Sequence, residues 1–218
     1  MKKTVSVAPM MDCTDRHEIY FLSLISKNVQ LYTEMIVANA IIRGDRDKLL
    51  SFKKISNPIV LQVGGSDPKE LFEACKISED YGYNEINLNL GCPSKKVQKN
   101  KFGACLMQEP NLVATCIESM AKATKLPITI KTRIGYNEVE NFEFLKSFIQ
   151  TTKNAGAQKF IIHARKALLK KLSPKENLNI PPLKYEFVYQ LKDHFNDDEI
   201  IINGGIKTTE DIKNHLLK

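Results

Sequence analysis

The sequence predicts an α/β fold, a TIM (β/α)₈ barrel of which about seven β/α units are present. Short, β-branched runs recur along the chain, at residues 5–8, 30–33, 59–63, 85–89, 128–132, 159–163 and 200–203. Helical patterns or loops of about a helix's length separate these runs, and alternating β and α segments predict a parallel sheet. Polar residues directly follow several of the runs. Strands rich in Ile and Val on both faces are typical of a barrel wall covered by helices.

Helix signals stand between the runs. Asp67 is a predicted N-cap, because Pro68 follows it at the first helical position and an acidic residue comes three positions after the cap. Apolar residues then recur near one helix face. Three further helices are predicted: one beginning near Pro110, one over about 139–154, and one capped by Thr208 with Asp211 at its third position.

The length bounds the domain organisation. With 218 residues, 43% of them hydrophobic, the chain can bury a core, so we expect one folded domain over residues 1–218. A closed barrel needs eight strands and typically about 250 residues. Seven runs would leave the first and last strands with unpaired edges. We therefore expect the N-terminal part of a longer protein, with a partner chain that completes the barrel as the alternative.

Several classes of protein are disfavoured. No apolar run approaches the roughly 20 residues of a membrane span, and the N-terminus does not read as a signal peptide. We expect a cytoplasmic protein with no membrane partner. The five cysteines form no C-x-x-C pair and no metal-ligand spacing, which favours free thiols and predicts no metal site.

The charge distribution points to a phosphate-bearing substrate. The net charge is +7, which permits a polyanionic partner. Basic residues cluster behind Cys92 and behind His163, and such clusters suit phosphates around a reacting group. The first cluster is Lys95, Lys96, Lys99 and Lys101, and the second is Arg165, Lys166, Lys170, Lys171 and Lys175.

Residues at the C-terminal ends of barrel strands line the mouth, where active sites are built. The residues at the ends of the predicted strands, or just after them, should therefore converge on one ligand. These residues are Pro9, Met10, Met11, Gln62, Asn89, Cys92, Lys131, Arg133, His163, Asn203, Gly204 and Gly205.

Each of these residues also has an ordinary structural explanation. A lone cysteine such as Cys92 is more often an inert packed residue than a catalyst, although its Gly-Cys-Pro turn favours a role. Lys131 after an apolar strand either snorkels or meets an anion. His163 can be a satisfied core histidine, and Gly204-Gly205 can be a tight turn or a phosphate-binding backbone.

These motifs resemble the flavin-dependent tRNA dihydrouridine synthases over essentially the whole chain. The matching stretches are residues 7–17, 31–35, 61–68, 85–94, 131–135, 161–166, 172–177, 180–183 and 202–207. The Leu-Ser-Pro-Lys-Glu-Asn segment at 172–177 and the Met-Met-Asp start look like the A subfamily, whose members modify uridine 20 or its neighbour 20a in the tRNA D-loop.

The resemblance implies a flavin mononucleotide (FMN) at the barrel mouth, reduced by NADPH, and tRNA as the partner of a protein that we expect to be monomeric at full length. Pro9, Met10 and Met11 would line the flavin ring through backbone groups, while Gln62 and Lys131 would bond its heteroatoms. His163 would contact the ribityl or phosphate side. Asn203, Gly204 and Gly205 would hold the phosphate.

The same resemblance assigns the substrate side. Cys92 would be the general acid that protonates C5 of the uracil. Asn89 would bond the flipped-out base with help from Arg133, and the basic clusters, Lys175 included, would hold the RNA backbone. The chemistry agrees with the residues, because no side chain supplies a hydride and a stacked base cannot be reached without flipping.

Two departures from the family pattern matter. The family continues through an eighth strand with a Gly-Arg phosphate contact and then a helical tRNA-binding domain, and both are absent from these 218 residues. Where A-type members have Arg-Glu, this chain has Leu178-Asn179, so a tRNA-contacting guanidinium is missing. Two alternatives remain: an inactive RNA-binding remnant, and a flavin barrel that reduces a small pyrimidine-like molecule.

Overall fold

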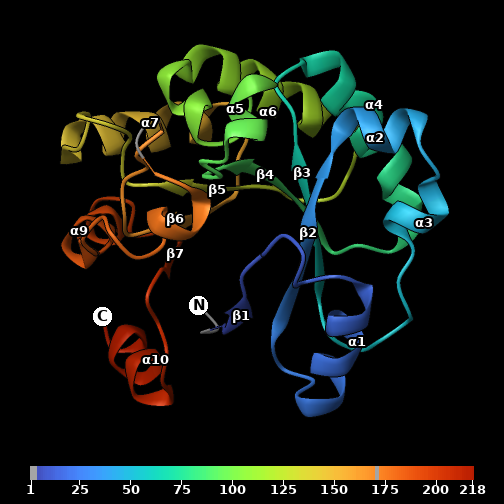
Figure 1. Ribbon diagram of the computed structural model, residues 1–218, viewed down its shortest axis with the longest axis horizontal. Helices are drawn as coiled ribbons and strands as arrows, with labels where there is room; N and C mark the ends of the chain where they lie inside the picture. The colour runs from blue at the N-terminus through green and yellow to red at the C-terminus, as the bar shows by residue number, and fades with distance from the viewer. Residues whose placement is uncertain (1–3, 170–171) are drawn as a thin grey trace.

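Seven parallel strands form one curved sheet in the computed structural model, which describes residues 4–169 and 172–218. The strands lie side by side in chain order, so each pairs with the next. The sheet curls with helices on its outside, as part of a TIM barrel does, and this confirms the predicted fold (Figure 1). The strands are β1 (Ser6–Val7), β2 (Gln30–Val37), β3 (Ile59–Gly64), β4 (Glu85–Leu90), β5 (Ile128–Arg133), β6 (Lys159–His163) and β7 (Glu199–Asn203).

Helices connect the strands, and α2, α4, α6 and α7 pack one against the next along the outer face of the sheet (Figure 1). The α-helices are α1 (Arg16–Ile25), α2 (Ala38–Arg43), α3 (Arg46–Leu50), α4 (Pro68–Ser78), α5 (Lys95–Lys99), α6 (Pro110–Ala123), α7 (Phe142–Asn154), α8 (Pro174–Asn177), α9 (Tyr185–His194) and α10 (Thr209–Leu216). The 3₁₀ helices are η1 (Glu79–Tyr81) and η2 (Gly103–Gln108).

The predicted helix starts follow from their capping residues. The Asp67 side chain accepts hydrogen bonds from the N–H groups of Lys69 and Glu70, and Thr208 and Asp211 form a reciprocal capping box. The helix predicted over 139–154 begins later, at Phe142. Its actual N-cap is Asn141, whose side chain accepts from Phe144. The preceding residues form a turn in which Tyr136 and Val139 pair their backbones.

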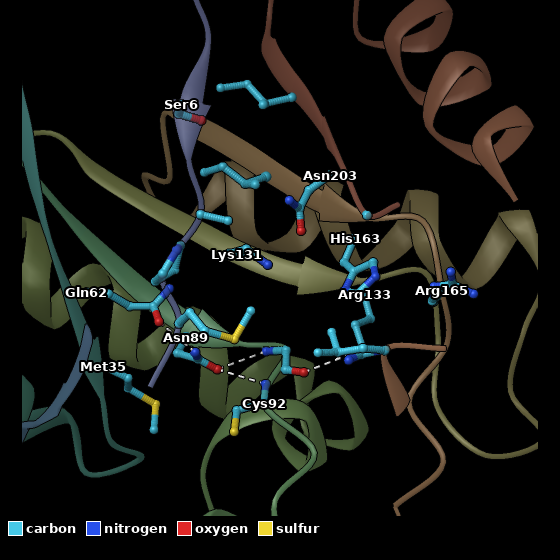
Figure 2. Close-up of a pocket in the computed structure, with 18 of the residues that line it drawn as sticks. Ser6, Met35, Gln62, Asn89, Cys92, Lys131, Arg133, His163, Arg165 and Asn203 are labelled. Carbon is cyan, nitrogen blue, oxygen red and sulfur yellow. Dashed lines mark hydrogen bonds between the residues drawn. The ribbon is translucent and has the colours of Figure 1, made fainter. Parts of the chain in front are cut away.

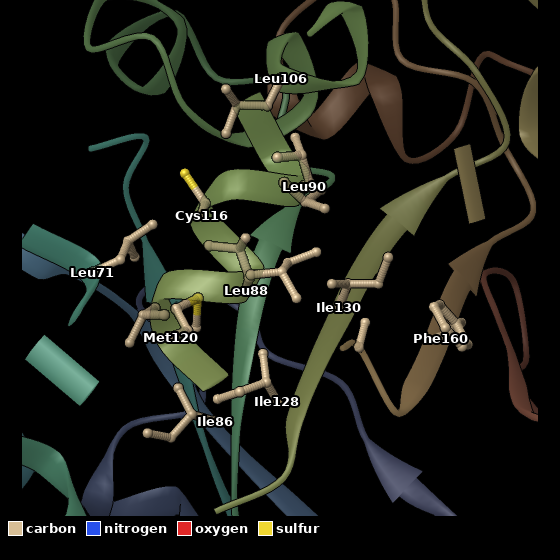
Figure 3. Packing of buried hydrophobic residues seen from close by; sticks show 14 of the residues in the cluster. Leu71, Ile86, Leu88, Leu90, Leu106, Cys116, Met120, Ile128, Ile130 and Phe160 are labelled. Atoms are coloured by element: carbon tan, nitrogen blue, oxygen red, sulfur yellow. The ribbon is translucent and has the colours of Figure 1, made fainter. Parts of the chain in front are cut away.

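The main hydrophobic core lies between the sheet and its outer helices. On β4, Ile86, Leu88 and Leu90 are fully buried and point towards α6, where they meet Cys116 and Met120 (Figure 3). Apolar burial of this kind contributes about 25 cal/mol per Å². The alternating residues of the same strand are Glu85, Asn87 and Asn89, and they point to the barrel interior.

The inner face of β4 departs from the general pattern of the strands. Strands rich in Ile and Val on both faces are typical of a barrel wall, but all three inward residues of β4 are polar, and each is less than a tenth exposed. Buried polar groups are tolerated where hydrogen bonds satisfy them. The alternation of polar and apolar residues in this strand is visible in the sequence, whereas the hydrogen bonds that satisfy the polar side chains are not.

Strand register brings the predicted site residues to two successive levels of the sheet. Asn89 of β4 lies beside Lys131 of β5. At the next level, Arg133 of β5 lies beside His163 of β6, which in turn lies beside Asn203 of β7. Because the strands are parallel, these positions all fall at the carboxyl end of the sheet, as the sequence predicted.

Candidate active site

The turn that follows β4 presents Cys92 at the edge of the interior (Figure 2). The thiol is free and half-buried. The Asn89 side-chain oxygen accepts hydrogen bonds from the backbone N–H groups of Gly91, at 3.1 Å, and Cys92, at 2.9 Å. An amide oxygen has two lone pairs, and both are used here. Asn89 thus fixes the direction in which the chain leaves the strand.

The carbonyl groups of the same turn are also held. Arg133 Nε donates to the Gly91 oxygen at 2.9 Å, and Ala104 N donates to the Cys92 oxygen at 2.9 Å. The second contact requires Gly103, whose φ is 74° and where a Cβ atom would lie 2.6 Å from the Cys92 oxygen. Close backbone approach on this side leaves the cysteine turn little freedom.

A chain of hydrogen bonds crosses the barrel interior and ends at this turn. Asn89 Nδ2 donates to Gln62 Oε1 at 2.8 Å, and Gln62 Nε2 donates to Asn87 Oδ1 at 2.8 Å. Asn87 Nδ2 then donates to Thr129 Oγ1 at 2.9 Å, and that hydroxyl donates to Glu85 at 3.0 Å. Because each amide has a partner that accepts and one that donates, the network fixes the orientation of Gln62 and Asn89.

Lys131 reaches into the interior from β5 (Figure 2). Among the described residues, its ammonium forms no hydrogen bond and no ion pair. Part of the side chain faces the cavity, but the group lies deep in the barrel. This burial, reinforced by the charge of Arg133, lowers the pKa of Lys131 to about 7. An anionic or electron-rich ligand atom is the partner that would stabilise its charged form.

His163 is a neutral imidazole at the end of β6. Burial is the main cause that lowers its pKa far below the ordinary value, and the nearby positive charges of Lys131, Arg133 and Arg165 act in the same direction. The ring packs under Gly204, where φ is 107° and a Cβ atom would lie 2.7 Å from His163 Nε2. Glycine is required at this position by both the backbone angle and the histidine.

The glycine pair continues with Gly205, whose φ is 69°. Tyr185 of α9 donates its hydroxyl to the Gly204 oxygen at 2.7 Å and so holds this turn from outside. Asn203 precedes the pair and points into the cavity beside His163 (Figure 2). The predicted phosphate-binding segment is therefore a shaped backbone turn that lines the same cavity as the predicted cysteine.

Arg133 has a different environment from the one expected. It was predicted to help bind the substrate, yet only 2% of its surface is exposed. Besides Gly91, it bonds the carbonyl oxygens of Lys166 and Asn177, both at 3.1 Å from Nη1. Burial lowers its pKa to about 10, so it remains charged at pH 7. The guanidinium joins three backbone segments, and a direct substrate contact remains a prediction.

The two basic clusters differ in how much charge they present. The lysines of the first cluster, at 95, 96, 99 and 101, are all exposed, as is Lys175 of the second. Lys166 instead forms an ion pair with Glu140 at 3.2 Å, and Arg165 donates to the Pro181 carbonyl. Lys170 and Lys171 lie outside the described residues. In the part of the chain that the structure describes, the exposed charge of the clusters is therefore concentrated on α5, just after it, and on α8.

The site opens into a cavity of about 1970 Å³. Typical ligand pockets occupy about 300–1,000 Å³, so this one is large. Its size arises because the mouth continues into the side between β1 and β7, which do not pair among the described residues. Residues of both edges, among them Ser6 and Ile202, line the same space. Pro9, Met10 and Met11 line it too, and the two methionines are 43% and 50% exposed.

The residues present fit a flavin nucleotide on three observations. Gln62 and Asn89 each use one N–H in the interior network, and the other has no partner within the described part of the chain. Lys131 lines the cavity without a partner in that same part of the chain. The Gly204-Gly205 turn lines the cavity at the end of β7 with φ angles of 107° and 69°, and backbone at the ends of barrel strands is a setting in which phosphates bind.

Two residues with a structural part in the site were not singled out from the sequence. Gln98 bonds the backbone next to Cys92, and Tyr185 holds the glycine turn. Neither lies in a recognisable motif, and the Leu169 and Gly204 carbonyls that they bond lie 71 and 19 positions further along the chain.

The described residues also bear on metal binding and membrane insertion. Within residues 4–169 and 172–218, no group of three or more His, Cys, Asp or Glu side chains is placed to hold a metal ion. No described helix is both long and apolar enough to cross a membrane.

The fold and site define a class: parallel β/α barrel proteins with a ligand cavity at the carboxyl ends of the strands and a cysteine in the turn after β4. Residues 6–218 match the family described as dihydrouridine synthase (Dus), and the chain belongs to that family. This confirms the resemblance found in the sequence.

Relatives are similar over nearly the whole chain. It is 55% identical to a tRNA-dihydrouridine(20/20a) synthase of Synechocystis sp. over 97% of its length. Proteins of the same name from Shewanella oneidensis and Yersinia pestis are 50% and 53% identical, over 99% and 97% of the chain. The matched region is 64%, 64% and 61% of those three proteins, so the chain spans less than two thirds of their length.

Proposed function

We propose that this chain is the flavin-binding catalytic part of an enzyme that reduces uridine to 5,6-dihydrouridine in tRNA. FMN would be the cofactor, NADPH the reductant, and position 20 or 20a of the D-loop the target. The observation that carries the proposal is the placement of a fixed cysteine, a buried lysine and a glycine turn around one cavity in a member of the dihydrouridine synthase family. The names of the relatives support tRNA as the substrate.

The cofactor would be held by residues already in place. Gln62 and Lys131 would bond the ring heteroatoms with their N–H groups, and residues 9–11 would lie against the ring. The neutral imidazole of His163 would contact the ribityl or phosphate side, and Asn203 with the two glycines would hold the phosphate. Bound FMN would supply the hydride that no side chain provides.

The remaining chemistry belongs to the chain itself. Reduction of the uracil 5,6 double bond adds a hydride at C6 and a proton at C5, and the Cys92 thiol would give that proton. The turn held by Asn89, Arg133 and Ala104 would keep the sulfur in one place while the base enters. Asn89 would also use its second N–H to orient the base. A base in a stack cannot reach this cavity, so the nucleotide must be flipped out.

The exposed lysines would hold the RNA around the flipped base. Lys96 and Lys175 are exposed and line the cavity, and Lys95 and Lys99 are exposed on the same helix as Lys96. Their contribution should fall steeply with salt, since phosphate binding releases counterions. A barrel that reduces a free pyrimidine would need no such surface. Salt-sensitive binding of tRNA therefore separates the two activities.

The remaining length of the relatives is where we would place an eighth strand and a helical tRNA-binding domain. Because tRNA is the proposed substrate, we also propose that the full-length protein is cytoplasmic. We further propose that it acts as a monomer. Light scattering of a full-length version would test the oligomeric state, and a stable dimer would contradict it.

The test uses the 218-residue chain, FMN, NADPH and unmodified tRNA, with dihydrouridine measured by mass spectrometry of the digested RNA. Visible absorption after desalting reports FMN retention separately. Cys92→Ala should keep the flavin and lose turnover, whereas Cys105→Ala, a half-buried cysteine away from the cavity lining, should keep both. Dihydrouridine formation at the wild-type rate by Cys92→Ala would refute the general-acid role. Colourless protein without activity would show that this chain alone does not perform the reaction.

A further inference from the structure

Gln98 lies on α5 and turns its polar side chain inward to bond other segments, while the lysines around it are exposed. Its Nε2 donates to the Pro93 carbonyl at 2.7 Å and to the Leu169 carbonyl at 2.8 Å. Pro93 directly follows Cys92, and Leu169 lies 71 positions beyond Gln98, in the loop after β6. Both acceptor residues are buried. One amide therefore joins the cysteine turn to a segment that is distant in sequence.

Arg133 makes the matching connection on the other side of the cysteine. It bonds the Gly91 carbonyl and, through Nη1, the carbonyls of Lys166 and Asn177. The carbonyls that flank Cys92 are thus each tied to the segment after β6. That segment includes α8, which carries the exposed Lys175. The cysteine turn and the basic segment are connected at two points.

We propose that Gln98 is a positioning residue for Cys92, acting through the Pro93 carbonyl and anchored by the Leu169 carbonyl. This proposal rests on the proposed function, in which the thiol must deliver a proton to one carbon atom of a flipped base. A displacement of about 1 Å at a reacting group can lower a rate roughly a hundredfold. The amide N–H groups are the working part of the side chain, because both partners are acceptors.

The donor requirement distinguishes positioning from simple space filling. Gln98→Glu has nearly the same size but places a carboxylate, which cannot donate, against two carbonyl oxygens. Gln98→Ala removes both hydrogen bonds without adding charge. It is the variant to measure if the glutamate variant does not fold. The control is Gln150→Ala, since Gln150 is an exposed glutamine on α7 that donates to Asn154 of the same helix at 2.8 Å.

Two readouts test the proposal. In the FMN-loaded enzyme, both Gln98 variants should lower kcat for tRNA about tenfold or more, while KM for tRNA and flavin content stay within about twofold of wild type. Independently of activity, the rate of iodoacetamide alkylation at Cys92, followed by peptide mass spectrometry, should change at least about threefold. Alkylation of the exposed Cys13 should stay constant, and Gln150→Ala should match wild type in every measurement.

Wild-type alkylation of Cys92 in both Gln98 variants would overturn the proposal. An equal change at Cys13 and Cys92 would also overturn it, because that result describes general loosening of the fold. If the wild-type protein reduced no tRNA, the proposed function would fail, and the ratio of the two alkylation rates would still decide whether Gln98 positions Cys92.

Discussion

The side-chain oxygen of Asn89 accepts a hydrogen bond from the backbone nitrogen of Cys92 at 2.9 Å, while its nitrogen donates to Gln62 at 2.8 Å. One buried amide thus connects the proposed acid to the proposed cofactor contact. Hydrogen bonds on both sides fix the orientation of the amide and link the cysteine turn to Gln62.

Asn89→Ala should destabilise the protein and slow the reaction. The change leaves two backbone N–H groups and the Gln62 oxygen without their partner, and an unsatisfied buried group costs about 1–3 kcal/mol. We expect the free energy of unfolding in urea to fall by about that amount or more. Asn154→Ala removes an exposed amide on α7 and should stay within about 0.5 kcal/mol of wild type. Equal stability of the two variants would show that the Asn89 bonds contribute little.

Lys131 predicts a pH dependence of flavin binding. Its pKa is lowered to about 7, so the amine is charged below that pH and neutral above it. Binding beside an electron-rich ring favours the charged form, and affinity for FMN should therefore fall as the pH rises from about 6 to 8. Lys131→Met should bind FMN more weakly at pH 6 and lack this part of the dependence. Fluorescence titration with FMN at several pH values measures the affinity of both proteins. Protonation of the flavin phosphate affects both proteins alike, so it cancels in the comparison. The same pH dependence of affinity in both proteins would contradict the prediction.

The same group predicts a stability change without ligand. The pKa of Lys131 is lower in the folded state than the ordinary 10.5, so the folded protein binds fewer protons than the unfolded chain between about pH 7 and 10.5. The free energy of unfolding should therefore rise across this window relative to Lys131→Met. Urea unfolding of both proteins at several pH values measures the difference. A difference that is constant with pH would mean that Lys131 keeps an ordinary pKa.

Gly204→Ala should lose flavin. A methyl group there would contact the His163 ring at less than van der Waals distance, and φ is 107°. Gly82 offers a matched control, because its φ is 87° but no atom lies within 4 Å of the position that a methyl group would take. Both alanine variants should lose about 1–2 kcal/mol of stability from backbone strain, and Gly204→Ala should lose more because of the contact with His163. Only Gly204→Ala should lose FMN retention, as read by visible absorption; loss in both would point to a general effect of destabilisation.

Glu85 should be important for stability. It forms an ion pair with Lys159 at 2.6 Å and accepts hydrogen bonds from Gln30, Tyr32 and Thr129, at the base of the interior network. Removing one partner of a buried pair costs about 3–5 kcal/mol, and Glu85→Gln should approach the lower end because Lys159 keeps Glu199 at 3.6 Å.

The control for Glu85 is Glu143→Gln, which loses only an exposed pair with Lys146. Its cost should lie within about 0–1 kcal/mol in the same urea experiment. Similar costs for the two variants would show that the buried position of Glu85 has no energetic consequence.

Much of the fold was predictable because it follows local rules. The strand predicted at 159–163 is β6 to the residue, and the caps at Asp67 and Thr208 are where the sequence placed them. Prediction stopped short in β2, expected at 30–33 and observed to Val37. A register shift between Tyr32 and Met35 interrupts the alternation on which the prediction depended.

The candidate site was predictable to the same extent. That Gln62, Lys131, His163 and Asn203 would gather with Cys92 followed from their common place at strand ends, and the cavity includes all five. The hydrogen-bond partners of the site residues could not be predicted from the sequence. Arg133 was expected to face the substrate, and no sequence signal marks its bonds to the carbonyls of Gly91 and Asn177, which lie far apart along the chain.

The sequence by itself determined where the strands form, their order, and which residues stand at the mouth of the barrel. Hydrophobic period, capping and turn chemistry act over a few residues, and a parallel sheet then carries each strand end to one side. The tertiary structure alone decided the hydrogen-bond network inside the barrel, the depressed pKa of Lys131 and the double connection that Gln98 and Arg133 make around Cys92. Burial and long-range hydrogen bonds depend on what the fold places nearby, and that is not written in any local segment.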